Sequence, residues 1–155
     1  MSIVASETPS TAVLDPATGR SGEILRLRMA LGIGAAVAVF AGSLVGDPAA
    51  ALRADPALGH LLRGMAVIKG ALALGAIAAL WWRFGRPIEV GLARAYSWSA
   101  WFMAGAAMVV WQLAHVGVGA LAFHGGELTL LTLAWFEHRA EVQRRPVGTS
   151  AARVR

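Results

Sequence analysis

The sequence contains no cysteine and little charge of either sign. Only 15% of its 155 residues are charged and 57% are apolar, whereas about a quarter of a soluble domain is charged. Without cysteine the chain forms no disulfide, no Cys-ligated metal or iron–sulfur centre and no catalytic thiol. The low charge leaves long uncharged runs, which are typical of a protein embedded in a lipid bilayer.

Common catalytic motifs are missing as well. The sequence has no G-x-x-x-x-G-K-[ST] nucleotide loop, no G-x-S-x-G nucleophile elbow and no H-E-x-x-H metal motif. The segments between the apolar runs are too short to form a nucleotide-binding domain. The sequence therefore favours a protein that is not an enzyme.

Four apolar runs have the length of transmembrane helices and lack the strict alternation of membrane β-strands. A bilayer requires every backbone polar group to be bonded within the protein. The sequence therefore predicts an all-α integral membrane protein, a four-transmembrane-helix bundle in which consecutive helices are antiparallel neighbours. The predicted spans cover about residues 27–46, 56–84, 95–117 and 120–138. They lie in a transmembrane domain, residues 25–141, between a disordered tail, residues 1–24, and a basic tail, residues 142–155.

Proline and glycine mark where the predicted helices begin and end. Asp suits the N-cap of a helix and Pro its first position. Asp47, which precedes a proline, should therefore start a short surface helix, and Asp55 should start the second span. Gly117 and Gly119 are expected to form the turn before the fourth span.

The arginines predict the orientation in the membrane. In membrane proteins the cytoplasmic loops carry the excess of Arg and Lys. Eleven of the arginines flank the spans on the side of the two termini, and only Arg53 and Arg63 lie on the opposite side. Both termini are therefore predicted to be cytoplasmic (N-in/C-in). We expect these arginines to contact anionic lipid and not nucleic acid.

The aromatic residues indicate the same orientation. Trp and Tyr gather at membrane–water interfaces, and all but Trp111 of those near span ends fall on the predicted cytoplasmic side. The predicted interface anchors are Trp81, Trp82, Trp98, Trp101 and Trp135. Arginine in place of lysine, with many Ala and Gly, is typical of a GC-rich bacterial genome. The predicted location is therefore a bacterial inner (cytoplasmic) membrane.

Few ionisable residues lie inside the predicted spans, where each is costly unless it faces protein or water. Lys69 lies near the middle of the second span, and Glu127 is the only acidic residue at a comparable depth. We expect the two to interact directly, or through Gln112, His115 or a water. These four residues form the predicted polar intramembrane cluster, with either a structural role or a role in a proton, ion or ligand site.

Three histidines, His60, His115 and His124, are predicted to lie at one level near the outer surface. Three imidazoles can ligate a metal with an open coordination position, and two can ligate a haem b. Histidines at an interface also bond water, headgroups or carbonyl groups. A metal or haem site and a purely structural role therefore both stay open, and the cofactor is unknown.

Gly42 and Gly46 form a small-xxx-small pair in the first span. Such a pair lets another helix approach closely. Because Gly is common in membrane helices generally, a specific helix-packing contact and an uninvolved surface are both open.

Two classes of function fit these residues. The first is a small non-catalytic accessory or structural subunit that packs against a larger bacterial inner-membrane complex. Its partners are the lipid bilayer and other membrane protein subunits or a second copy of the chain. The second is a haem-, metal- or quinone-binding membrane protein or a small transporter that uses the outer-half polar cluster. Small-residue helix faces and the scarcity of catalytic groups favour the first class.

Overall fold

The part of the chain that the structure describes is built from α-helices. The computed structural model describes residues 16–144. Its helices are α1 (Pro16–Ser43), α2 (Pro48–Ala54), α3 (Pro56–Arg83), α4 (Val90–Trp111) and α5 (Val116–Arg144). All regular secondary structure within residues 16–144 is helical, which confirms the predicted all-α class.

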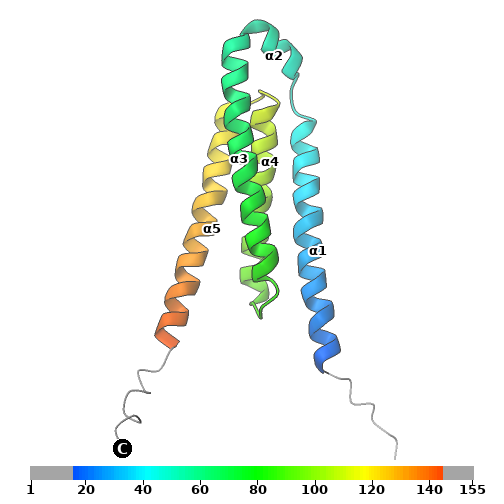
Figure 1. The fold of residues 1–155 in the computed structure, drawn as a ribbon, viewed down its shortest axis with the longest axis vertical. Coiled ribbons are helices and arrows are strands. Elements are labelled where there is room, and N and C mark those ends of the chain that lie inside the picture. Colours follow the sequence, from blue (N-terminus) through cyan, green and yellow to red (C-terminus); the bar gives the residue numbers. More distant parts are fainter. Residues whose placement is uncertain (1–15, 145–155) are drawn as a thin grey trace, which may run out of the picture.

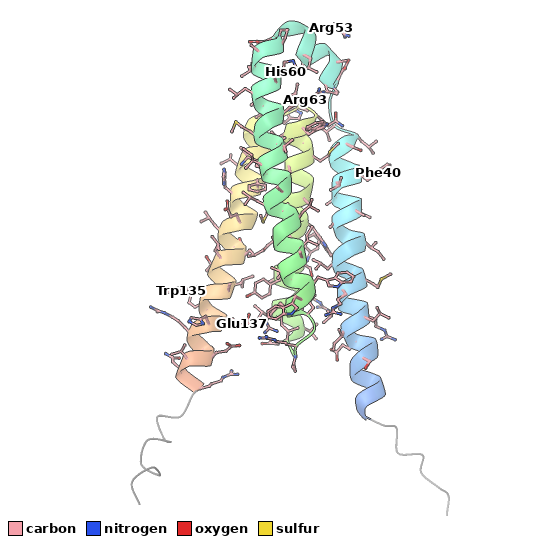
Figure 2. All side chains as sticks on the ribbon, in the orientation of Figure 1. Phe40, Arg53, His60, Arg63, Trp135 and Glu137 are labelled. Carbon is pink, nitrogen blue, oxygen red and sulfur yellow. The ribbon has the colours of Figure 1, made fainter. Side chains whose placement is uncertain are left out.

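The helices run alternately up and down the long axis of the molecule. α2 crosses over one end and joins α1 to α3, after which α4 and α5 follow in opposite directions (Figure 1). The start of α1 and the end of α5 therefore lie at the same end, the terminal end, and α2 marks the opposite α2 end. Figure 2 shows Arg53 and Arg63 toward the α2 end and Trp135 and Glu137 toward the terminal end.

Three helices are long and apolar enough to cross a membrane. They comprise Ser21–Ser43 within α1, Pro56–Arg83 and Val116–Arg144. α4, which contains Arg94 and Tyr96, is not one of the three. It is instead the most enclosed helix, with ten buried residues against five in α3 and three in α5.

α4 lies at the centre of the bundle. It packs against α1, α3 and α5, whereas α1 has little contact with α3. Many of its buried residues are small, including Ala100, Ala104 and Ala107, so three helices can surround it closely. Consecutive helices are neighbours as predicted for α3–α4 and α4–α5. The prediction is wrong for α1, whose main neighbour is α4, because α2 intervenes between α1 and α3.

The proline-marked starts of α2 and α3 are as predicted. The carboxylate of Asp47 accepts a hydrogen bond from the backbone N–H of Ala49 (3.0 Å). Asp55 is the N-cap of α3 and accepts one from the backbone N–H of Leu58 (3.0 Å). Each aspartate thereby satisfies one of the N–H groups that a helix start leaves without a partner.

The first and last helices are longer than predicted. α1 begins at Pro16, so residues 16–24 are helical and do not form a tail, and α5 continues to Arg144. The sequence signal for the early start is a third Asp-Pro pair, at residues 15–16. The rest of the two predicted tails, residues 1–15 and 145–155, lies outside the described residues.

The turn between α4 and α5 comes earlier than predicted. It places Leu113 and His115 at positive φ, 58° and 44°, whereas Gly117 and Gly119 lie inside α5. A Cβ atom on Gly119 would stand only 3.0 Å from the Val110 side chain. This glycine therefore allows α5 to approach α4 and makes no turn.

Candidate functional site

A chain of three polar side chains connects α3 to α5. The Nζ atom of Lys69 lies 3.1 Å from His124 Nε2, and His124 Nδ1 lies 3.1 Å from Glu127 Oε2. Lys69 and Glu127 therefore communicate, but through His124 and not through Gln112 or His115. Lys69, His124 and Glu127 are called the α3–α5 polar chain below.

The hydrogen-bonding capacity of the two ends assigns the protons of the histidine between them. An ammonium group only donates, so His124 Nε2 must accept from Lys69; a carboxylate only accepts, so His124 Nδ1 must donate to Glu127. A neutral imidazole protonated at Nδ1 meets both requirements. The α3–α5 polar chain then holds one positive charge on Lys69 and one negative charge on Glu127, with the neutral ring of His124 between them.

Lys69 is the buried end of the α3–α5 polar chain. It is 8% exposed, and its Nζ atom lies 4.3 Å from the centroid of the buried Phe123 ring, whose face attracts a cation. The side chains of His124 and Glu127 are 59% and 37% exposed. The α3–α5 polar chain thus runs from the contact between α3 and α5 to the outer surface of α5.

The outer surface of α5 carries a stripe of large side chains that includes His124. The α5 stripe consists of exposed residues at heptad spacing, namely Leu121, His124, Leu128, Leu131 and Trp135. Such spacing places side chains along one face, where they pack into the holes of a neighbouring helix. These residues are exposed because none of the described helices covers this face of α5.

The other residues of the predicted clusters lie apart from the α3–α5 polar chain. The Gln112 side-chain amide donates to the Ser43 carbonyl oxygen (3.0 Å) and ties the end of α4 to that of α1. His60, in α3, and His115, in the turn, are exposed. Within residues 16–144 no three His, Asp or Glu side chains are grouped so that they could hold a metal ion. Both ring nitrogens of His124 already have partners.

Gly42 lies at a close contact between α1 and α4. A Cβ atom there would stand 2.8 Å from the Gly105 carbonyl oxygen and 3.0 Å from Met108 Cβ. Gly46 is not helical: it follows the end of α1 at Ser43 and has a φ of 93°, which glycine adopts without strain. The two glycines therefore act separately, Gly42 in helix packing and Gly46 in the connection to α2.

A second polar network joins three helices near the terminal end. Arg83 of α3 forms an ion pair with Glu137 of α5, and the Tyr96 hydroxyl of α4 donates to Glu137 Oε2 (3.0 Å). The sequence predictions omitted this network. The signal for it was present, because Arg83 and Glu137 both stand near the cytoplasmic ends of their predicted spans.

The five predicted interface anchors have two different environments. Four are exposed, namely Trp81, Trp82, Trp98 and Trp135. Arginine side chains lie over three of these rings, with Cζ 4.4 to 5.7 Å from the centroids. Trp101 is half-buried, and its indole N–H donates to the Leu31 carbonyl oxygen (3.0 Å), so it packs between α4 and α1.

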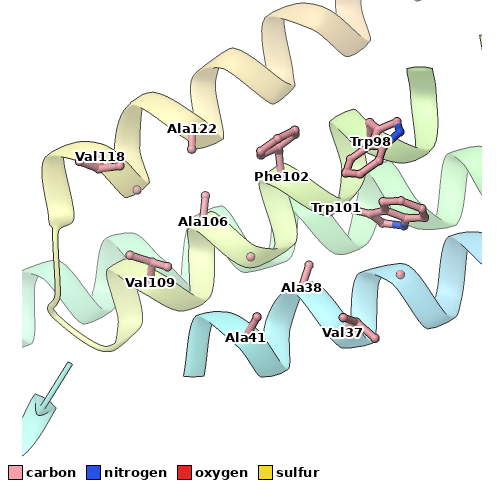
Figure 3. Close-up of a pocket in the computed structure, with 13 residues that line it drawn as sticks. Val37, Ala38, Ala41, Trp98, Trp101, Phe102, Ala106, Val109, Val118 and Ala122 are labelled. Atoms are coloured by element: carbon pink, nitrogen blue, oxygen red, sulfur yellow. The ribbon is translucent and has the colours of Figure 1, made fainter. Parts of the chain in front are cut away.

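Two apolar grooves flank α4. The first, of about 530 Å³, lies between α1, α4 and α5, and Trp98, Trp101 and Phe102 line one end of it (Figure 3). The second, of about 460 Å³, lies between α1, α3 and α4. The second groove exists because α1 packs on α4 and has little contact with α3.

Comparisons with known proteins supply no relative. No protein-family model, curated protein or solved structure matches the chain.

Proposed function

We propose that the protein crosses a bacterial inner membrane four times, with both termini cytoplasmic, and serves as a non-catalytic accessory subunit docked on a larger membrane complex. α4 forms the fourth span, because the three apolar helices around it bury its polar residues Tyr96, Ser97 and Ser99. The observation that carries the proposed function is the exposure of two ionisable side chains, His124 and Glu127, on the outer face of α5.

The depth of these side chains argues against contact with lipid. Glu127 lies 11 residues, ~17 Å, from the start of α5 at a rise of 1.5 Å per residue. The 29-residue helix is longer than the ~30 Å thickness of a hydrocarbon core. His124 and Glu127, which lie well inside the helix, therefore both fall within the core. An ionisable group there costs about 3 kcal/mol on insertion scales unless it faces protein or water. The exposed pair therefore favours a protein partner on this face.

The α5 stripe indicates what this partner presents. Leu121 and Leu128 stand one heptad apart, on either side of His124, and favour a transmembrane helix packed lengthwise on α5. Because both nitrogens of His124 are occupied, the remaining hydrogen-bonding capacity belongs to the Glu127 carboxylate. The partner helix should therefore carry a donor opposite Glu127, such as a hydroxyl, an amide or a base.

The α3–α5 polar chain also favours a second candidate, a small proton transporter. A proton can pass from Lys69 Nζ to His124 Nε2 while His124 Nδ1 gives its proton to Glu127. The transfer leaves all three groups neutral and moves one proton equivalent from the helix contact to the surface of α5. The haem and metal alternatives have less support, because His124 offers no free nitrogen and His60 and His115 lie elsewhere.

A photo-reactive amino acid at Leu128 in native membranes tests the proposed docking face. Irradiation should give one discrete product with another membrane protein. The same substitution at Phe40, which is 65% exposed on α1, is the matched control and should give none. The accessory-subunit proposal fails if Leu128 yields lipid adducts alone. It also fails if the purified chain conducts protons in liposomes and His124→Leu abolishes that flux, since the transporter is then correct.

A further inference from the structure

The groove between α1 and α3 is a second feature that the proposed docking face leaves unexplained. The groove is lined by apolar and mostly small residues, with Ala66, Gly70 and Ile77 of α3 facing Ala35 and Val39 of α1. From Ala66 to Ile77 the groove follows 11 residues of α3, or ~17 Å. This length is close to half of a ~30 Å hydrocarbon core, which is the depth that one lipid leaflet occupies.

A cation stands at the end of this groove nearest α2. Arg63 lies one turn before Ala66 on α3, and its Cζ atom lies 5.1 Å from the ring centroid of Trp111, which lines the groove. The Nε atom of Arg63 is buried and has no hydrogen-bond partner within residues 16–144. Buried polar atoms are nearly always paired, so this group is unusual within the described residues. The Arg63 side chain as a whole is only half-buried, so the rest of the guanidinium group is open to an acceptor from outside the chain.

We propose that this groove holds one acyl chain of an anionic phospholipid, with the lipid phosphate on Arg63. The apolar walls receive the chain, and the guanidinium group of Arg63 donates to the phosphate oxygens, for which its planar fork is well matched. Trp111 supplies the amphipathic ring that belongs at the level of the headgroups. The bound lipid fills the gap that α1 and α3 leave on this face of α4. This proposal rests on the membrane placement but not on the docking face of α5.

Lipid retention tests the headgroup contact. Protein is reconstituted in nanodiscs of phosphatidylglycerol and phosphatidylcholine in equal amounts, extracted in mild detergent, and its bound lipids are quantified by mass spectrometry. Arg63→Gln should reduce the preference for phosphatidylglycerol about fivefold, as expected for one basic residue at a membrane surface. Arg63→Lys, which keeps the charge, should retain most of it. Arg53→Gln is the matched control, because Arg53 is exposed on α2 at the same end of the molecule.

A paired substitution on α3 tests the acyl-chain groove. A Cβ atom on Gly70 or on Gly75 would have nothing within 4 Å, so both positions accept a larger side chain. Of these two glycines, only Gly70 lines the groove. Gly70→Leu should therefore release both phosphatidylglycerol and phosphatidylcholine, while Gly75→Leu retains them.

Three outcomes would overturn the proposal. The first is an equal loss of preference in Arg63→Gln and Arg53→Gln, which would show attraction by general surface charge. The second is full lipid retention in Gly70→Leu. The third is displacement of the phospholipid by free palmitate added in equimolar amount, which would make a fatty acid the ligand. Failure of cross-linking at Leu128 bears on none of these, so the two proposals can fail separately.

Discussion

Replacement of His124 by leucine should destabilise the protein by about 3 kcal/mol, because the buried ammonium group of Lys69 loses its acceptor. The Lys69 Nζ atom gives up the 3.1 Å contact with His124 and keeps only the Phe123 ring at 4.3 Å. Breaking a buried ionic contact by removing one partner costs about 3–5 kcal/mol. The lower end applies here, because the His124 side chain is 59% exposed.

The cost should nearly disappear once the lysine is gone. In a Lys69→Met background no buried cation remains, so His124→Leu removes only the hydrogen bond to Glu127, worth about 1 kcal/mol. The coupling free energy between Lys69 and His124 should therefore be about 2 kcal/mol. A parallel cycle with Glu127→Gln should give a smaller coupling, because an amide oxygen still accepts from His124 Nδ1.

The free energy of unfolding can be measured by titration with SDS in mixed micelles, with helicity followed by circular dichroism. His60→Leu is the matched control, since His60 is an exposed histidine on α3, and it should change the free energy by less than about 0.5 kcal/mol. An equal effect of His124→Leu in the native and Lys69→Met backgrounds would refute the reasoning, because it would mean that Lys69 and His124 do not stabilise one another.

Two further predictions concern packing and orientation. Gly42→Ala should lower the free energy of unfolding by about 1–3 kcal/mol through overpacking, since a Cβ atom there meets the Gly105 carbonyl oxygen at 2.8 Å. Gly75→Ala is the control, because a Cβ atom there has nothing within 4 Å. Equal melting temperatures of the two variants would contradict the contact. Since the native chain has no cysteine, Gly117→Cys and Val142→Cys can be labelled separately on intact cells with an impermeant thiol reagent. Only Gly117→Cys should react, and labelling of both would exclude the four-span orientation.

Much of the fold follows from local sequence features. Long uncharged runs predict the helices, and the Asp-Pro pairs predict where α2 and α3 begin, because hydropathy and capping act within a few residues of the chain. The third such pair, at residues 15–16, coincides in the same way with the start of α1 at Pro16. The position of the α4–α5 turn was predicted wrongly because its residues do not follow the usual local preferences. The turn places Leu113 and His115 at positive φ, where glycine or asparagine is usual.

The candidate sites depended more on how the helices pack. The sequence predicted Lys69 and Glu127 at a similar depth in the membrane, because depth follows from the position of a residue within its apolar run. It did not reveal that His124 joins them, that Arg83 meets Glu137, or that Arg63 stands at the end of a groove. These contacts depend on which side of each helix faces its neighbour.

The sequence by itself therefore determined the helical class, the starts of α2 and α3 and the approximate level of Lys69 and Glu127 along the bundle axis. The tertiary structure alone decided that α4 is central, that α1 stands apart from α3, and which polar side chains meet. The physical reason is that these helices are apolar on nearly all sides, so no amphipathic pattern fixes their rotation. Their rotation is set by close contacts between small residues, such as Gly42 against Gly105, and such contacts exist only once the helices are packed together.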